Sequence, residues 1–183
     1  MDTQPKSQIL VCAPSNAATD LIATRLINVG HYKPRQLIRL NAPSRGYDEL
    51  PPSLRDYSPT IISEGKKHFE TPPGDRLKEF RVVICTCYYA SIPRAAEVED
   101  HFTHIFVDEA GHAAESEIMV PILQNANSST NIIVSGDVSA FCNAFVCWLT
   151  YHVCAFSRCN WAQLFSLRPA SSVIWILAFW NAW

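Results

Sequence analysis

The feature that most constrains this chain is a short apolar run that ends in two adjacent carboxylates. Residues 104–107 (HIFV) are followed directly by Asp108, Glu109 and two small residues. This pattern predicts a buried parallel strand whose carboxyl end meets a polar loop at the edge of a sheet. In that interpretation Asp108 holds Mg²⁺ and Glu109 activates water, as in a Walker B element. The alternative is a strand that ends in Asp-Glu at a solvent-exposed loop.

A second strand, loop and helix are predicted near the start of the chain. Residues 9–13 form an apolar run, Pro14, Ser15 and Asn16 follow it, and residues 17–29 have helical spacing of apolar residues at Leu21, Ile22, Leu26 and Val29. Ser15 or Asn16 is a natural N-cap. Such a loop presents the backbone N–H groups and small donors that a phosphate group requires. The alternative is an ordinary capped turn.

The intervening sequence continues the alternation of strands and helices. We expect little regular structure in residues 41–62, a helical turn at 75–80, a helix at 113–124, and further strands at 36–40, 81–86 and 131–135. Repeated strand-loop-helix units with polar residues at the strand ends describe an α/β fold with a doubly wound parallel sheet.

Composition agrees with a globular protein, with 48% hydrophobic and 17% charged residues. The net charge of −2 provides no basic field, so any contact with nucleic acid is local. Residues 1–8 are polar and lack a secretory signal, which favours a reducing compartment and free thiols. We expect Cys85 and Cys87 to point to opposite faces of their strand, forming neither a disulfide nor a shared metal site.

Four ordered segments carry a resemblance to a known family. They are residues 9–20 (ILVCAPSNAATD), 83–87 (VICTC), 102–112 (FTHIFVDEAGH) and 133–137 (IVSGD). In this order they resemble motif Ia, the following nucleic-acid motif, motif II and the start of motif III of the first RecA-like domain of superfamily 1 helicases. The match is to the Upf-like branch, and within it to the Armitage and silencing-defective RNA helicases.

The resemblance implies a RecA-like, P-loop NTPase fold and ATP-dependent RNA unwinding or ribonucleoprotein remodelling. It implies ATP and Mg²⁺ as cofactors, with Asp108 as the metal residue and Glu109 and Asp137 as catalytic residues. Single-stranded RNA would contact Pro14, Ser15, Asn16, Thr86 and Cys87. The family also implies silencing or decay proteins as partners, and a place in the cytoplasm or its ribonucleoprotein granules, without an obligate membrane.

Departures from the family pattern limit what this chain does alone. The 183 residues contain no Gly-x-x-x-x-Gly-Lys-Ser/Thr, and Ala140 stands where the family has a phosphate-sensing glutamine. We therefore expect residues 1–137 to form a partial first RecA-like domain that lacks the phosphate loop and the second RecA-like domain. The chain alone is expected to be inactive as an ATPase. The alternative is a non-catalytic RNA- or protein-binding module.

Residues 138–183 have a different composition. They hold all five Trp, four of the seven Cys and two Arg, with no Lys and no acidic residue. The hypothesis is that this apolar tail is a read-through or shifted-frame sequence. One alternative is a membrane-tethered fragment. Another is a metal site formed by Cys142, Cys147, His152, Cys154 and Cys159. The spacings of these residues fit no common zinc pattern.

Overall fold

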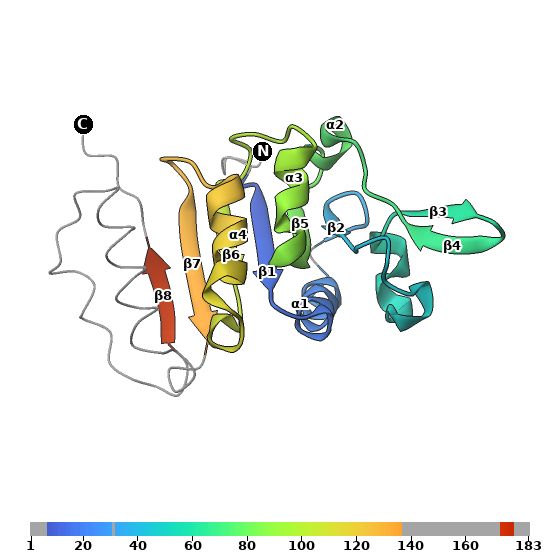
Figure 1. Cartoon of the computed structure of the whole chain (residues 1–183), viewed down its shortest axis with the longest axis horizontal. Helices are drawn as coiled ribbons and strands as arrows, with labels where there is room; N and C mark the ends of the chain where they lie inside the picture. Colours follow the sequence, from blue (N-terminus) through green and yellow to red (C-terminus); the bar gives the residue numbers. More distant parts are fainter. Residues whose placement is uncertain (1–6, 31, 137–172, 178–183) are drawn as a thin grey trace, which may run out of the picture.

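A computed structural model describes residues 7–30, 32–136 and 173–177 of the chain (Figure 1). In this part the central sheet has strands β1 (Ile9–Ala13), β2 (Leu37–Arg39), β5 (Val82–Thr86), β6 (His104–Val107), β7 (Asn131–Gly136) and β8 (Val173–Leu177). The α-helices are α1 (Asn16–Asn28), α2 (Gly74–Leu77), α3 (Ile92–Ala95) and α4 (Glu115–Asn125). Short 3-10 helices are η1 (Tyr47–Glu49), η2 (Pro52–Tyr57), η3 (Tyr88–Ser91) and η4 (Ala110–His112).

The strands of the central sheet lie in the order β2-β5-β1-β6-β7-β8. All neighbours from β2 to β7 are parallel. Leu10 of β1 stands opposite Val83 of β5 on one side and Ile105 of β6 on the other. In a parallel sheet helices cover both faces, so residues on both sides of each strand are buried, which explains the continuous apolar runs. The predicted RecA-like, doubly wound α/β sheet is confirmed.

Strand β8 pairs antiparallel with β7, and no strand is expected there from the sequence. The other expectations for residues 138–183, including the read-through hypothesis and the metal-site alternative, lie outside the described residues. Across residues 7–30, 32–136 and 173–177, the structure contains no helix with the length and apolar character needed to cross a membrane.

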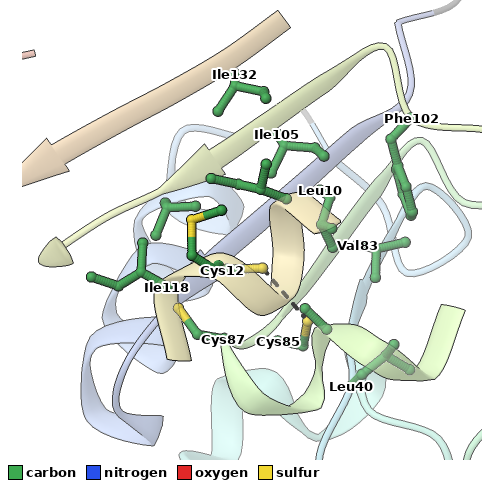
Figure 2. Packing of buried hydrophobic residues seen from close by; sticks show 14 of the residues in the cluster. Leu10, Cys12, Leu40, Val83, Cys85, Cys87, Phe102, Ile105, Ile118 and Ile132 are labelled. Carbon is green, nitrogen blue, oxygen red and sulfur yellow. Dashed lines mark hydrogen bonds between the residues drawn. The ribbon is translucent and has the colours of Figure 1, made fainter. Parts of the chain in front are cut away.

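Side chains of the strands alternate between two hydrophobic clusters, one on each face of the sheet. Leu10 of β1 belongs to the cluster covered by α4 and η3, which also buries Ile118 (Figure 2). Val11, the next residue, belongs to the cluster covered by α1 and η2, which buries Ala23. Each large apolar side chain removed from water in this way stabilises the fold by about 1.5–3 kcal/mol.

Helix α1 forms where apolar spacing predicts it, and its buried side combines apolar and polar residues. Ile22 and Leu26 pack against the cluster that contains Val11, whereas Leu21 and Val29 are 50% and 64% exposed. The fully buried residues of the helix are Ala18, Thr19, Asp20 and Ala23. Thr19 and Asp20 are buried because both bond to Arg39 of β2, which apolar spacing does not predict.

The stretch at residues 41–62 has more regular structure than expected. It contains η1 and η2 and leads into an antiparallel hairpin of β3 (Thr60–Ser63) and β4 (Lys66–Phe69) that projects from the domain (Figure 1). Glu64 and Gly65 form the turn with φ of 51° and 73°. Two positive φ values suit a two-residue hairpin turn, but Glu-Gly lacks the Asn-Gly or Asp-Gly signal that identifies such turns in a sequence.

The cysteines correct another expectation. Cys85 and Cys87 lie in the same cluster rather than on opposite faces, because residues two apart along a strand share a side of the sheet (Figure 2). Cys12 lies beside them, with its Sγ 3.9 Å from Cys85 Sγ. All three are free thiols. Burial raises the pKa of Cys12 well above its usual value and that of Cys87 to about 12.

We predict that these three thiols resist alkylation in the folded chain. With a pKa of about 12, only ~10⁻⁴ of the Cys87 side chain is thiolate at pH 8, and the thiolate is the reactive form. Brief iodoacetamide treatment followed by peptide mass spectrometry should leave Cys12, Cys85 and Cys87 unmodified in buffer and modify them in urea. Equal modification in both conditions would contradict the packing described for this cluster.

Candidate functional site

Four of the predicted functional segments meet at the carboxyl edge of the sheet. The loop after β1 is joined to the chain after β5 by Cys87 N–H, which donates to Ala13 O at 2.9 Å. On the other side of β1, Asp108 N–H donates to Cys12 O at 2.8 Å. The predicted RNA-contacting segments and the predicted Mg²⁺ residue therefore lie on neighbouring strands of one edge.

Asp108 is held by a residue of the next strand. Ser135 Oγ, near the end of β7, donates to Asp108 Oδ1 at 2.6 Å. A hydroxyl bonded to a carboxylate at this distance is a strong, charge-assisted hydrogen bond, so it fixes the carboxylate orientation. Ser135 was not predicted as a site residue, although it lies inside the segment that resembles motif III. Asp137, the predicted catalytic residue two positions later, lies outside the described residues.

The donor set at Asp108 fits Mg²⁺ that arrives with a nucleotide. Oδ2 accepts no hydrogen bond from the described residues, so one carboxylate oxygen is available for a metal-bound water. Nowhere in the described chain does a group of three or more His, Cys, Asp or Glu side chains form a self-sufficient metal site. Mg²⁺ commonly uses one or two carboxylates and completes its shell with water and substrate phosphates. Asp108 is suited to that share of the coordination.

Glu109 occupies an unusual backbone conformation beside Asp108. Its φ of 53° and ψ of 31° are left-handed, and its side chain is exposed. For a residue other than glycine this conformation costs about 1–2 kcal/mol. It turns the chain sharply out of β6 into η4 and leaves the Glu109 carboxylate at the surface of the carboxyl edge. Its assignment as the base remains a prediction.

The loop at residues 14–16 is a capped helix N-terminus, as predicted. Ser15 is the N-cap of α1, and its Oγ accepts from Ala18 N–H at 3.1 Å. Ser15 and Asn16 are exposed, and Pro14 is half-buried. The Asn16 side chain is fixed by the buried Arg39, because Asn16 Oδ1 accepts a hydrogen bond from Arg39 Nη2 at 2.9 Å. The loop therefore exposes an ordered amide at the positive end of a helix.

Arg39 is the centre of a buried polar cluster between α1 and β2. The residue has no exposed surface, and its Nε donates to Asp20 Oδ1 at 2.9 Å. Nη2 also donates to Thr19 Oγ1 at 2.6 Å, and Nη1 donates to Leu40 O. Burial lowers the pKa of the Arg39 guanidinium, and the Asp20 carboxylate acts in the opposite direction. The pairing with Asp20 is what makes a buried charge tolerable here.

A second arginine shares the same carboxylate. Arg45 Nη2 donates to Asp20 Oδ2 at 2.6 Å, and its Nη1 donates to Asn41 Oδ1 at 2.7 Å. Arg45 Nε lies 3.8 Å from Glu49 Oε2, which is beyond hydrogen-bond distance and on an exposed side chain. Two buried guanidinium groups thus share the one buried carboxylate of Asp20.

The sequence holds a signal for this cluster that apolar periodicity does not use. Arg39 lies in an otherwise apolar strand. Asn16 and Asp20, in the helix that precedes this strand, are four residues apart and so share one face of that helix. A charged residue in a buried strand requires a partner of opposite charge, and i, i+4 spacing places two candidates on one helix face. Searching for that pairing would have indicated Arg39 and Asp20.

The segment after β5 supplies a mixed surface. Thr86 is half-buried, and its Oγ1 accepts from Tyr89 N–H at 3.4 Å. Cys87 is fully buried, so in this structure it presents no atom to RNA. Tyr88, which the sequence analysis did not single out, is 77% exposed at the same edge. An exposed aromatic ring is the group on which single-stranded bases stack.

We predict that Asp20→Asn destabilises the chain by about 3–5 kcal/mol, because it leaves two buried guanidinium groups without their counter-charge. The free energy of unfolding would be measured by urea titration and circular dichroism. Asp48→Asn, an exposed carboxylate of η1, is the matched control and should change stability by about 0.5 kcal/mol or less. A loss below about 1 kcal/mol for Asp20→Asn would show that the cluster contributes little.

Comparison with known proteins identifies the family. A family described as AAA domain matches residues 1–72 and 54–139. The chain is 35% identical over 135 residues to the putative helicase mov-10-B.2 of Danio rerio and 35% identical over 134 residues to the RNA helicase Mov10l1 of Mus musculus. It is 31% identical over 147 residues to the probable RNA helicase armi of Drosophila melanogaster.

These alignments cover 73% of this chain and 13%, 10% and 12% of the three relatives, so the chain spans only a small part of their length. The residues that the AAA domain family matches contain all four motif segments together with the described sheet from β1 to β7. The resemblance to superfamily 1 RNA helicases of the Upf-like, Armitage type is confirmed, and the chain belongs to the AAA domain family.

Proposed function

We propose that this chain is the nucleotide- and RNA-contacting part of an ATP-dependent RNA helicase. The observation that carries the proposal is the carboxyl edge, where Asp108 is oriented by Ser135 one strand away from the capped loop at residues 14–16. A helicase requires its nucleotide site and its RNA site to lie side by side, because ATP hydrolysis must change the contacts with RNA. The relatives named as RNA helicases support the same assignment.

On the nucleotide side, each residue has a defined task. Asp108 would hold Mg²⁺ of ATP through its free carboxylate oxygen, and Glu109 would accept a proton from the attacking water. Asp137 would link the γ-phosphate to the RNA site. Bound Mg²⁺ would supply positive charge that offsets the negative charge developing during phosphoryl transfer.

On the RNA side, the proposed contacts are donors to the phosphodiester backbone. Ser15 and Asn16 stand at the N-terminus of α1, and Thr86 is the last residue of the adjacent strand β5. Helix N-termini and small polar side chains bind phosphate oxygens without reading the bases. Single-stranded RNA is therefore the proposed ligand. Silencing or decay proteins in the cytoplasm or its ribonucleoprotein granules are the proposed protein partners.

We predict that the purified 183-residue chain does not hydrolyse ATP above the rate of its Glu109→Gln variant. Its sequence contains no Gly-x-x-x-x-Gly-Lys-Ser/Thr loop to hold the β- and γ-phosphates, and phosphoryl transfer depends almost entirely on such positioning. Phosphate release would be measured with and without single-stranded RNA. RNA-stimulated turnover that Glu109→Gln abolishes would instead show a complete site, formed for example by self-association of the chain.

The absence of that loop from the sequence favours a second candidate, a non-catalytic module that binds RNA through the loop at residues 14–16. We predict that the chain binds a single-stranded oligonucleotide in a salt-sensitive manner and that the double variant Ser15→Ala, Asn16→Ala binds about tenfold more weakly. Fluorescence anisotropy gives both affinities. Asn28→Ala, at the far end of α1, is the control and should bind as the unmodified chain does. Unchanged affinity in the double variant would exclude this loop as the RNA contact.

A further inference from the structure

The orientation of the Asn16 amide is determined by chemistry. Arg39 Nη2 lies 2.9 Å from the inward-facing atom of this amide. A guanidinium group only donates hydrogen bonds, so the atom that faces it must be the acceptor Oδ1. Nδ2 with its two N–H groups then points away from Arg39, and it donates to no group within residues 7–30, 32–136 and 173–177.

We propose that Arg39 is a positioning residue that acts through Asn16, holding its outward N–H groups toward the phosphodiester backbone of single-stranded RNA. This inference rests on the proposed RNA contact at residues 14–16 and assigns that contact its chemistry. Phosphate oxygens are acceptors only, so they suit an amide that presents nitrogen and would be repelled by one that presents oxygen. Binding of this kind does not depend on base identity.

Arginine is suited to this task because its planar group is fixed at several points. Nε is bonded to Asp20, Nη1 to Leu40 O, and Nη2 to both Thr19 and Asn16. Three of these partners belong to α1 and the fourth, Leu40, follows β2, so the guanidinium group cannot turn without breaking bonds to both segments. An exposed Asn side chain tied to this group loses its rotamer freedom during folding rather than during binding, which favours association.

The charged neighbour Arg45 provides a matched control. It bonds to the same Asp20 carboxylate and is similarly buried, but its partners are Asn41 and Glu49 rather than Asn16. Arg39→Lys and Arg45→Lys therefore keep the charge and disturb the same ion-pair cluster. Only Arg39→Lys removes the fork that reaches Asn16.

The first experiment needs no RNA. In the ¹⁵N-labelled chain, the heteronuclear NOE of Asn16 Nδ2 should show an ordered amide in the unmodified protein and in Arg45→Lys. In Arg39→Lys it should show a mobile one. Equal order of the Asn16 amide in all three proteins would overturn the proposal. Because this readout is independent of RNA, it separates failure of the positioning role from failure of the proposed RNA-binding function.

The second experiment tests whether Arg39 acts through Asn16 in binding. Arg39→Lys should weaken binding of an oligouridylate about fivefold, and of an oligoadenylate by the same factor, while Arg45→Lys stays within about twofold. In an Asn16→Ala background the effect of Arg39→Lys should disappear. The same loss in both backgrounds would overturn the proposal, because Arg39 would then act through stability or charge. No binding by the unmodified chain would overturn the RNA function itself.

A third variant keeps the inference testable should Arg39→Lys fail to fold. Asn16→Asp preserves an acceptor for Arg39 and replaces the outward N–H groups by a negatively charged oxygen. Its thermal stability should be unchanged or higher, and its RNA binding should fall by tenfold or more. Binding equal to that of the unmodified chain would overturn the assignment of Asn16 Nδ2 as the phosphate donor.

Discussion

The parallel alignment of β1 between β5 and β6 is the constraint on which the rest of the site depends. In a parallel sheet all carboxyl ends lie at one edge, so segments far apart in the sequence become neighbours once the register is set. Leu10 opposite Val83 and Ile105 fixes that register. Strand pairing, rather than contacts between the loops, therefore places the loops after these strands side by side. The arrangement of polar residues at the edge follows from the packing of the core.

The buried arginine shows how packing and function share one interaction. A charge inside the fold is costly unless several hydrogen bonds satisfy it, and Arg39 meets that requirement with Asp20, Asn16 and Thr19 of α1. The same bonds leave the Asn16 amide with nitrogen outward, so a stabilising cluster also sets the polarity of the proposed RNA contact.

Regular, strongly apolar elements were predictable from the sequence, whereas polar contacts between residues distant in sequence were not. Strand β1 was predicted with its observed bounds because five apolar residues precede a proline. The burial of Thr19 and Asp20 on α1 was not predictable from apolar spacing, because it depends on hydrogen bonds to Arg39, which is distant in sequence. Ser135 was missed for a related reason, since a serine at a strand end becomes significant only when the neighbouring strand places Asp108 within 2.6 Å.

Both halves of the edge depend on the last two carbonyl groups of β1. Cys12 O receives Asp108 N–H, and Ala13 O receives Cys87 N–H, immediately before Pro14. Proline has a fixed φ and no N–H of its own, so it joins β1 to the RNA-facing loop as a stiff link that needs no further backbone partner. The end of β1 therefore bonds to the chain around Asp108 on one side and to the chain after β5 on the other, and the loop with Ser15 follows directly from it.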